Sequence, residues 1–150
     1  GFGTVVEWVY HLLERRPATD LFPTLEAARM NFIARSPLNR GLLTARGYRE
    51  EWRYPTTDFR STVPGEVVQW TKASIAALEL SADQLDELGQ LALRFATSPT
   101  AVSAVIPGMK DIAHLQHYLR LHDADPLPEE LLERIAARTA RCYPPWDNMP

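Results

Sequence analysis

The chain has 150 residues, of which 45% are hydrophobic and 23% charged, and its formal net charge is −3. These values are ordinary for one globular domain over residues 1–150, and they give no basic field for nucleic acid. The lone Cys142 excludes an internal disulfide and a thiolate zinc site. No apolar run is long enough to span a membrane, and the first residues do not form a signal peptide. We therefore expect a cytoplasmic protein with no membrane partner.

The first half of the chain alternates short apolar runs with a helical segment. Residues 4–10 are apolar, β-branched and aromatic, which predicts a buried strand. Asp20 is expected to cap a helix that continues to about Arg29, with Pro23 tolerated in the first turn. Residues 30–34 predict a second strand. Pro37 then disfavours a regular element, so a long loop is expected from 36 to 63, a length that is uncommon without a function or local structure of its own.

The second half predicts helices around a third strand. A helix is expected from about 64 to 78, and Ser81 with Gln84 makes a capping box for another that ends near 96. Residues 101–106 form an apolar strand that is stopped by Pro107 and Gly108.

Two more helices are expected after this strand. Asp111 caps the first of them, which carries Ile112, Leu115 and Leu119 on one stripe. Pro128 begins the last helix. The residues of that helix expected to face inward are Leu131, Leu132, Ile135 and Ala136.

Strands that alternate with helices are typical of a parallel sheet with helical crossovers. The strands lack polar alternation, as expected when both faces of the sheet are covered. These observations predict an α/β fold and leave a doubly wound sheet and a (β/α) barrel both open. In either architecture, ligands bind beyond the carboxyl ends of the strands, here near residues 7–10, 36–41 and 107–110.

Two of these strand ends have features that suit phosphate. Ser36 and Arg40 flank a turn, and Gly108 with Lys110 precedes the helix that Asp111 caps. Unpaired backbone N–H groups and the positive end of a helix dipole attract phosphate. A dinucleotide, with two phosphate regions, could use both ends.

Four segments resemble motifs of the aldo-keto reductase family. The sequence SPLNRGLLT at 36–44 is similar to the family's SPL-x-x-GLLTG segment. ALRF at 92–95, followed by VIPG at 105–108, resembles ALR(W/F)…VIPG. YHLL at 10–13, followed by two arginines, resembles YNLL-x-R, and DFR at 58–60 matches a DFR in the family's long loop. The motifs follow the family's order and cover most of the chain.

The resemblance implies an eight-stranded (β/α) barrel that uses NADPH or NADH. This chain would form a partial TIM-type barrel of about three parallel strands with surrounding helices, matching the last three strands. The loop at 36–38 would hold the pyrophosphate through backbone amides, and residues 106–118 would hold the adenosine end and any 2′-phosphate. Glu7 would lie where the family places a glutamine against the nicotinamide carboxamide, and Tyr10 at its aromatic stacking position. The expected cofactor-binding residues are Glu7, Tyr10, Ser36, Pro37, Leu38, Arg40, Ile106, Gly108, Lys110, His114 and Tyr118.

Several of these positions depart from the family pattern. Glu7 cannot donate a hydrogen bond as glutamine does unless it is protonated. Tyr118 stands where an asparagine is usual, and His114 where arginine or glutamine is common, whereas Lys110 keeps a positive charge. The departures predict that binding of NADP(H) or NAD(H) is weakened or lost, and they leave the choice between the two open.

The family's catalytic tyrosine, lysine, aspartate and histidine belong to the first half of the barrel, which this chain does not contain. A hydride transfer needs a proton donor of tuned pKa, so we expect no catalytic residue here and leave open whether the chain is an enzyme. A complete barrel needs about 250 residues. Three strands alone would leave two sheet edges and an apolar face bare.

Three hypotheses follow from this size. The chain is a segment of a reductase whose other half lies elsewhere, so that the rest of the barrel or another chain covers its edges. Alternatively, it is a truncated relative without catalysis that works as a homo-oligomer or a hetero-complex. In the third hypothesis, a truncated relative has new chemistry on its strand-end loops. We rank them in this order.

Three other residue patterns have a second interpretation as sites of their own. Asp111, His114 and His117 have a spacing that could ligate a metal, but a solvated helix face explains it better, so no metal site is expected. Arg35 and Arg40 belong either to a solvated loop or to a phosphate site, for which arginine geometry is suited. The aromatic residues Trp52, Tyr54 and Trp70 either line a substrate pocket or seal the long loop onto the barrel.

Overall fold

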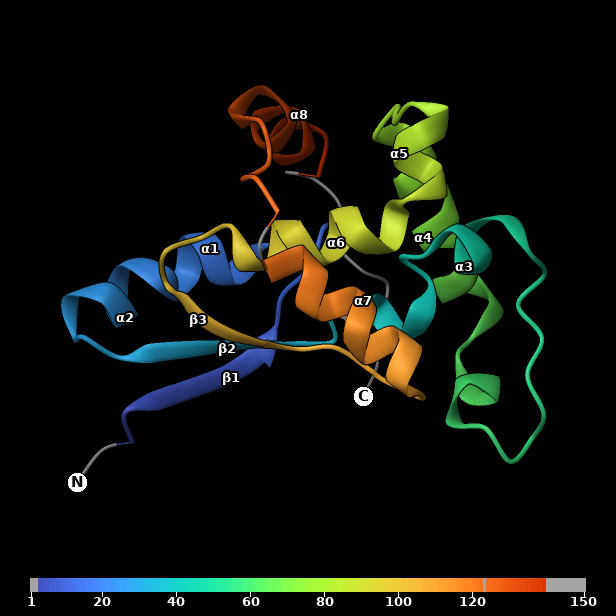
Figure 1. The fold of residues 1–150 in the computed structure, drawn as a ribbon, viewed down its shortest axis with the longest axis horizontal. Helices are drawn as coiled ribbons and strands as arrows, with labels where there is room; N and C mark the ends of the chain where they lie inside the picture. The colour runs from blue at the N-terminus through green and yellow to red at the C-terminus, as the bar shows by residue number, and fades with distance from the viewer. Residues whose placement is uncertain (1–2, 123, 140–150) are drawn as a thin grey trace.

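The computed structural model describes residues 3–122 and 124–139. Three strands, β1 (Val5–Val9), β2 (Asn31–Arg35) and β3 (Val102–Ile106), form one parallel sheet in the order β1-β2-β3. Figure 1 shows the strands running in the same direction with helices around them. The expected α/β class and the partial TIM-type barrel of three parallel strands are therefore confirmed, with the sheet open at both edges.

Helices connect the strands and follow the last one. They are α1 (Arg16–Asp20), α2 (Phe22–Ala27), α3 (Ala45–Arg49), α4 (Gly65–Ala77), α5 (Ala82–Asp86), α6 (Leu88–Thr97), α7 (Ile112–His122) and α8 (Glu129–Thr139), with 3-10 turns at Asn39–Gly41 and Phe59–Thr62. The long segment after β2 therefore has local structure of its own. In the described residues, no helix has the length and apolar character needed to cross a membrane.

Two predicted helices differ from those observed. Asp20 does not cap the first helix, because α1 already begins at Arg16 and ends at Asp20. Proline occupies the first turn of both short helices, where its missing N–H costs nothing. The capping box of Ser81 and Gln84 is present with both hydrogen bonds, but the backbone at Glu87 (φ −101°, ψ 21°) interrupts the predicted continuous helix between α5 and α6.

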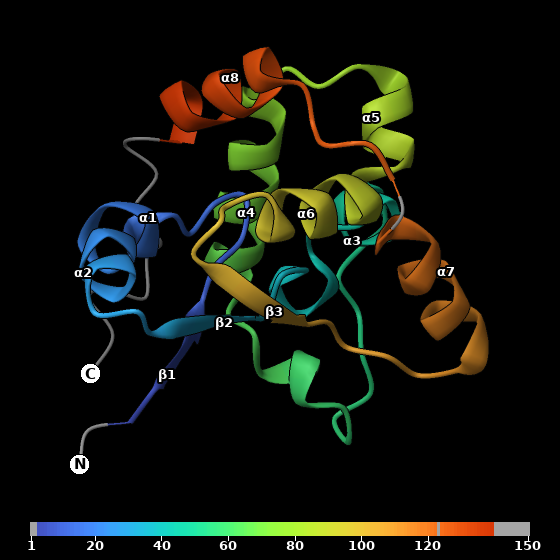
Figure 2. The same cartoon turned by 60° about the vertical axis from the view of Figure 1, so that its left-hand side comes forward.

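The core lies on one face of the sheet. Phe32 and Ala34 of β2 are buried there, and Phe32 meets the rings of Tyr10 and Phe22 edge-on or tilted. Helix α6 packs on β3 and α2 packs on β2. In Figures 1 and 2, α1, α2 and α6 lie on this side of the sheet, and α8 lies beyond α6.

The prediction that both faces of every strand are covered is wrong. Only β2 contains buried residues; β1 and β3 are partly or fully exposed along their lengths. Side chains alternate between the two faces of a strand, so Glu7, Ile33 and Arg35 share the face that the helices do not cover. The physical reason is that apolar strands can be covered only by neighbouring elements, and the described residues supply these for one face alone.

The last two helices differ in how they are held. Arg15 donates from Nη1 to the carbonyl of Ala136 (2.9 Å) and to Oγ1 of Thr139 (3.1 Å), which ties α8 to the segment after β1. Ile135 of α8 is buried, as predicted. By contrast, the predicted apolar stripe of α7 is exposed, with Ile112 at 73% and Leu119 at 61%.

Candidate functional site

The carboxyl ends of the parallel strands lie at the same edge of the sheet, and each continues into a segment predicted to bind ligand. β1 runs into Tyr10, β2 into the turn that begins at Ser36, and β3 into Pro107 and Gly108. Figure 1 shows α3, α4 and α7 gathered toward this end of the sheet. The fold therefore brings the three segments to one side of the molecule, as the sequence predicts.

The turn after β2 has an unusual backbone. Ser36, Asn39, Arg40 and Gly41 all have positive φ angles, of 56°, 43°, 60° and 100°. The amide of Asn39 donates to the carbonyl of Ser36 (2.9 Å), and that of Gly41 donates to Leu38 (2.8 Å). Positive φ is uncommon for residues other than glycine. The amides of Leu42 and Leu43 also donate within the turn, to Asn39 and Leu38. The N–H groups that remain in a turn of this kind can bind an anion, which is the chemistry expected here.

The turn after β2 is held by tight packing underneath it. Leu42 and Leu43 are fully buried, and the Asn39 amide lies 3.5 Å from Oγ1 of Thr71 on α4. Gly47 of α3 approaches so closely that a Cβ there would lie 2.0 Å from the carbonyl oxygen of Gly41. Arg40, in contrast, is exposed. The backbone shape is therefore fixed from inside while a guanidinium remains on the outer surface.

The segment after β3 is more open. Ile106, Gly108 and Lys110 are exposed, and no atom comes within 4 Å of the position where a Cβ of Gly108 would lie. Asp111 caps α7 as predicted, since its Oδ1 accepts from the amide of His114 (2.8 Å). The amide of Lys110 lies 3.4 Å from Nδ1 of the same histidine. Backbone, lysine and imidazole thus share one exposed surface.

Tyr118 connects the middle of α7 to the turn after β3. Its hydroxyl donates to the carbonyl of Gly108 (3.0 Å), and its ring lies parallel to that of His114 with centroids 6.2 Å apart. Burial, with a smaller contribution from Asp111, raises the pKa of the Tyr118 hydroxyl. His117 meets the same ring at 6.0 Å. The two histidines and the tyrosine form a small aromatic surface, and the described residues contain no group of three side chains that could hold a metal.

At the end of β1, Glu7 and Arg35 lie together on the uncovered face of the sheet. Oε1 of Glu7 is 3.9 Å from Nε of Arg35, and both side chains are about half exposed. Glu7 is therefore accessible, as its predicted contact with a carboxamide requires. Its partner Arg35 lies on the strand and not in the loop.

Tyr10, expected beside the nicotinamide, lies in the core and is 2% exposed. Its ring stacks on Phe95 (5.6 Å, 20°) and packs against Phe22 (5.2 Å). Burial raises the pKa of its hydroxyl to about 12, and nearby Arg15 opposes the shift. The structure does not bring the Tyr10 ring to the exposed surface that holds Glu7.

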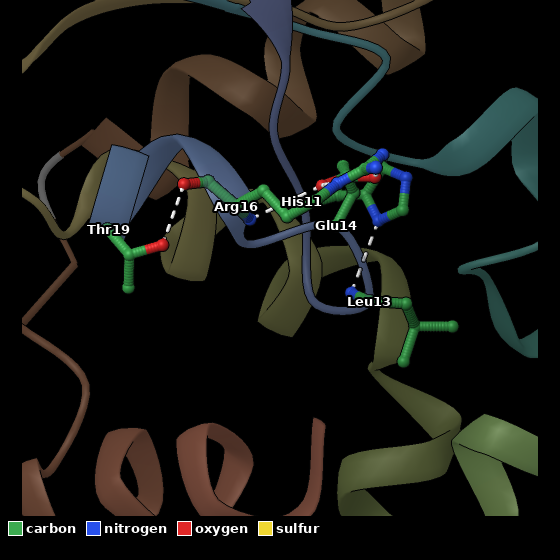
Figure 3. Close-up of polar contacts among 5 residues, drawn as sticks. All are labelled: His11, Leu13, Glu14, Arg16 and Thr19. Carbon is green, nitrogen blue, oxygen red and sulfur yellow. Dashed lines mark hydrogen bonds and ion pairs between the residues drawn. The ribbon is translucent and has the colours of Figure 1, made fainter. Parts of the chain in front are cut away.

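Two buried polar residues near this strand end were not predicted from the sequence. Figure 3 shows His11, whose Nδ1 accepts from the amide of Leu13 (3.2 Å), and Glu14, bound by Arg16. Burial and then the charge of Arg40 lower the pKa of His11 to about 3, so the imidazole is neutral. Glu14 accepts from Nε (2.8 Å) and Nη2 (2.5 Å) of Arg16. Polar residues on either side of two buried leucines were the sequence signal for this compact turn.

An open cleft of about 490 Å³ borders the free edge of β1. Trp8 and Val9 of the strand form one side of it, α1 with the residues next to it forms the other, and Arg35 lies at its border. The lining is Trp8, Val9, Glu14, Arg16, Pro17, Asp20, Leu21 and Arg35. A hollow with apolar and charged groups at an unpaired strand edge suits a strand or helix from another part of a protein.

The long segment after α3 folds onto itself. The Arg60 guanidinium lies 3.9 Å from the centre of the Tyr54 ring and forms a two-point ion pair with Asp58. Nε1 of Trp52 donates to the carbonyl of Arg60 (3.2 Å). The hydrogen bonds that Asp58 accepts from the Arg60 side chain and backbone lower the pKa of this carboxyl group. Trp52 and Tyr54 therefore stabilise the loop itself. Trp70, the third aromatic residue of this group, packs against the core.

The chain matches the model of the aldo/keto reductase family over residues 4–139. Its fold is similar to a glycerol dehydrogenase from Gluconobacter oxydans, with a TM-score of 0.71 and 22% identity, over 93% of this chain and 43% of that one. It is also similar to the holo form of an aldo-keto reductase from Bacillus halodurans, with a TM-score of 0.63 and 23% identity, over 90% of this chain and 42% of the other. None of the curated proteins matches by sequence. The chain spans less than half the length of these structures.

Proposed function

Because the chain belongs to the aldo-keto reductase family, we propose that it supplies the NAD(P)H-binding side of an oxidoreductase whose catalytic half lies on other polypeptide. The observation that carries this proposal is the turn after β2, where Ser36, Asn39, Arg40 and Gly41 have positive φ angles at the ligand-binding end of a parallel sheet. Positive φ angles at residues other than glycine raise the conformational free energy of the folded chain. Binding of an anion would be a functional reason for this backbone shape.

The residues at this end fit a dinucleotide. The turn after β2 with exposed Arg40 suits a pyrophosphate, because charge-assisted hydrogen bonds to phosphate are strong. The open backbone at Gly108, the charge of Lys110 and the ring surface of His114 and Tyr118 suit an adenosine end with or without a 2′-phosphate. When bound, the nicotinamide group would supply the hydride, and the residues of this chain would bind and orient it.

The catalytic half is proposed to cover the bare edges of the sheet. Trp8 on the edge strand β1 is 53% exposed. The apolar stripe of α7, which follows the other edge strand, β3, is also exposed. Exposed strand edges and apolar patches are liabilities that proteins cover. We propose the rest of the barrel as this cover, in a cytoplasmic protein that uses NADP(H) or NAD(H).

Titration with NADPH and with NADH, followed by tryptophan fluorescence, tests the proposal. We expect saturable binding of at least one of them, and Arg40→Gln should weaken it about tenfold through loss of a charge-assisted hydrogen bond. Arg29 is a matched control, since it is also exposed with a positive φ of 53° but precedes β2 at the opposite end of the sheet. Arg29→Gln should bind as the wild type does. Absence of binding to both nucleotides would refute the proposal.

The same bare surfaces favour a second candidate, a non-catalytic subunit that forms a homo-oligomer or binds a partner. Its expected result is a stable dimer, or larger assembly, that binds no nucleotide. Mass measurement by light scattering, beside the titration, distinguishes the two candidates.

A further inference from the structure

The geometry points to Thr71 of α4 as a positioning residue for the turn after β2, acting through the side chain of Asn39. The inference deepens the proposed function and rests on it, because that function assigns this turn to the pyrophosphate of a dinucleotide. Thr71 lies 32 residues after Asn39 in the chain. Neither residue is among the expected cofactor contacts, so the role of Thr71 is to hold the turn in shape and not to touch the ligand.

The hydroxyl of Thr71 is placed where a polar group needs a partner. Thr71 shares the buried face of α4 with Val67 and is fully buried, and a buried hydroxyl without a hydrogen bond costs free energy. Threonines in helices often bond to the carbonyl four residues earlier, as Thr139 does with Ile135. The Thr71 hydroxyl instead accepts from Nδ2 of Asn39, at 3.5 Å. This helix side chain is therefore directed at the turn.

Asn39 controls the direction of an amide that remains available to a ligand. It has a φ of 43° and is 4% exposed. The peptide plane that follows it carries the N–H of Arg40, so the ψ angle of Asn39 sets the direction of that group. The amides of Asn39, Gly41 and Leu42 donate within the turn, whereas that of Arg40 donates to no backbone carbonyl of the described residues. It is one of the N–H groups left for an anion.

The contact with Thr71 stabilises the conformation that Asn39 needs. A left-handed backbone costs asparagine some free energy, although less than it costs most residues. Without its acceptor, Asn39 would either leave a buried NH2 unsatisfied or move to another conformation, and the amide of Arg40 would then be held less precisely. Donors that are held in place before binding give higher affinity, because less conformational freedom is lost when the ligand arrives.

The other end of the turn has an anchor that is local in sequence. Oγ1 of Thr44 donates to the carbonyl of Gly41 (2.8 Å) and accepts from the amide of Gly47 (3.0 Å). Thr71 differs from it because it reaches the start of the turn from a separate helix. Since Thr44 remains in place, loss of the Thr71 contact should weaken anion binding without unfolding the turn.

Calorimetric titration of the full chain with ADP-ribose, which carries the pyrophosphate and lacks the nicotinamide, tests the inference. Thr71→Val keeps the approximate size of the side chain and removes the acceptor. It should weaken ADP-ribose about fivefold, the size expected for one uncharged hydrogen bond. Thr71→Ser keeps the hydroxyl and should bind as the wild type does. Ser74→Ala is the matched control, because Ser74 is a hydroxyl residue on the same buried face of α4, and it should also keep wild-type affinity.

A double-mutant cycle separates positioning from general damage to α4. Asn39→Gly removes the same contact from the other side, and glycine adopts a left-handed backbone without steric cost. It should weaken ADP-ribose by a similar factor, and Thr71→Val should add nothing in that background. Equal weakening by Thr71→Val in both backgrounds would assign the effect to packing of α4 and overturn the inference. If Thr71→Val does not fold, Asn39→Gly alone decides, and unchanged affinity in that variant overturns the inference.

The outcomes distinguish this inference from the proposed function. If the wild-type protein binds ADP-ribose and Thr71→Val binds it equally well, the positioning role is wrong and the proposed function stands. If Thr71→Val and Ser74→Ala weaken binding alike, α4 supports the turn only as a packed helix, and the inference fails. If the wild-type protein binds neither ADP-ribose nor the dinucleotides, the proposed function fails and the positioning role fails with it.

Discussion

The turn after β2 and the segment after β3 are predicted to hold two parts of one ligand, yet they are built in opposite ways. The first packs Leu42 and Leu43 completely inside the domain and closes against Gly47. The second leaves the stripe of α7 in solvent, and Gly108 has no close neighbour. The first segment is therefore shaped by this chain alone, whereas the second still presents the apolar surface that a neighbouring element would cover.

Under the proposed function, this difference locates the segment that the rest of the barrel would cover. A binding site is precise when packing holds its backbone, and the turn after β2 meets that condition. α7 has mainly the contact of Tyr118 with Gly108 and a few contacts with α6 to position it. We expect the first segment to keep its shape in the isolated chain and the second to gain rigidity when its stripe is covered.

The largest expected contrast compares one leucine from each segment. Leu43→Ala should lower the free energy of unfolding by about 2–5 kcal/mol, because it leaves a cavity in the core. Leu119→Ala should change it by less than about 0.5 kcal/mol, because that side chain is 61% exposed. Urea unfolding followed by circular dichroism measures both values. A large cost at Leu119 would mean that α7 is covered in solution, for example by a second copy of the chain.

Gly47→Ala should disturb the turn after β2, because Gly47 of α3 packs directly against Gly41 of that turn. The added Cβ would lie 2.0 Å from the Gly41 carbonyl oxygen, so backbone must move, and overpacking of this kind costs roughly 1–3 kcal/mol or more. Nucleotide affinity should fall as well, because the turn changes shape. Gly65→Ala is the matched control: it lies at the start of α4 with no atom within 4 Å of the added Cβ. It should be neutral or stabilising, and equal losses in the two variants would contradict the model of the turn.

The sequence predicted where strands and helices begin better than it predicted which of them are buried, and the reason is physical. Apolar runs and the capping signals at Ser81 and Asp111 depend on local chemistry, so the strands and several helix starts were found. The break at Glu87 carries no such signal. The early start of α1 did carry one, Pro17 in its first turn, which the prediction did not use. Burial depends on which elements are present, so the exposure of β1, β3 and α7 could not be derived from their apolar character.

The same limit applies to the candidate site. The turn at Ser36–Gly41 was predicted from its motif, and its backbone angles suit that role. Tyr10 was expected to contact the ligand, but packing against three phenylalanines places it in the core. Arg35 was assigned to a loop because its neighbour precedes a proline, and only the strand register reveals its position beside Glu7. Pairings between distant residues depend on register, which motifs do not encode.

Acid should destabilise the domain through the buried His11, in the turn after β1. Its pKa is about 3 in the folded protein and near 6.5 when unfolded, because burial, and then Arg40, disfavours the charged form. The unfolded state therefore binds the proton first, so the stability from neutral His11 is complete above pH 6.5 and is lost as the pH falls toward 3. Between pH 7 and pH 5 the loss should be about 2 kcal/mol.

Unfolding by urea across this range, before most carboxylates titrate, measures the effect of pH. His11→Asn should remove most of the dependence, since asparagine can still accept from the Leu13 amide without binding a proton. His114→Asn, at an exposed position on α7, should keep it. A dependence that survives in His11→Asn would assign it to another group.

The smallest expected effect concerns the contact that positions α7. Tyr118→Phe removes the hydrogen bond to the Gly108 carbonyl, and a partly exposed bond of this type contributes about 0.5–1 kcal/mol. Because α7 is otherwise weakly held, the loss should appear as faster hydrogen exchange of its amides and not as a lower global stability. Tyr48→Phe is the control, since its partly buried ring packs against the core instead. If exchange in α7 is the same in both variants, other contacts hold the helix, and the contrast between the two segments is smaller than the exposed stripe suggests.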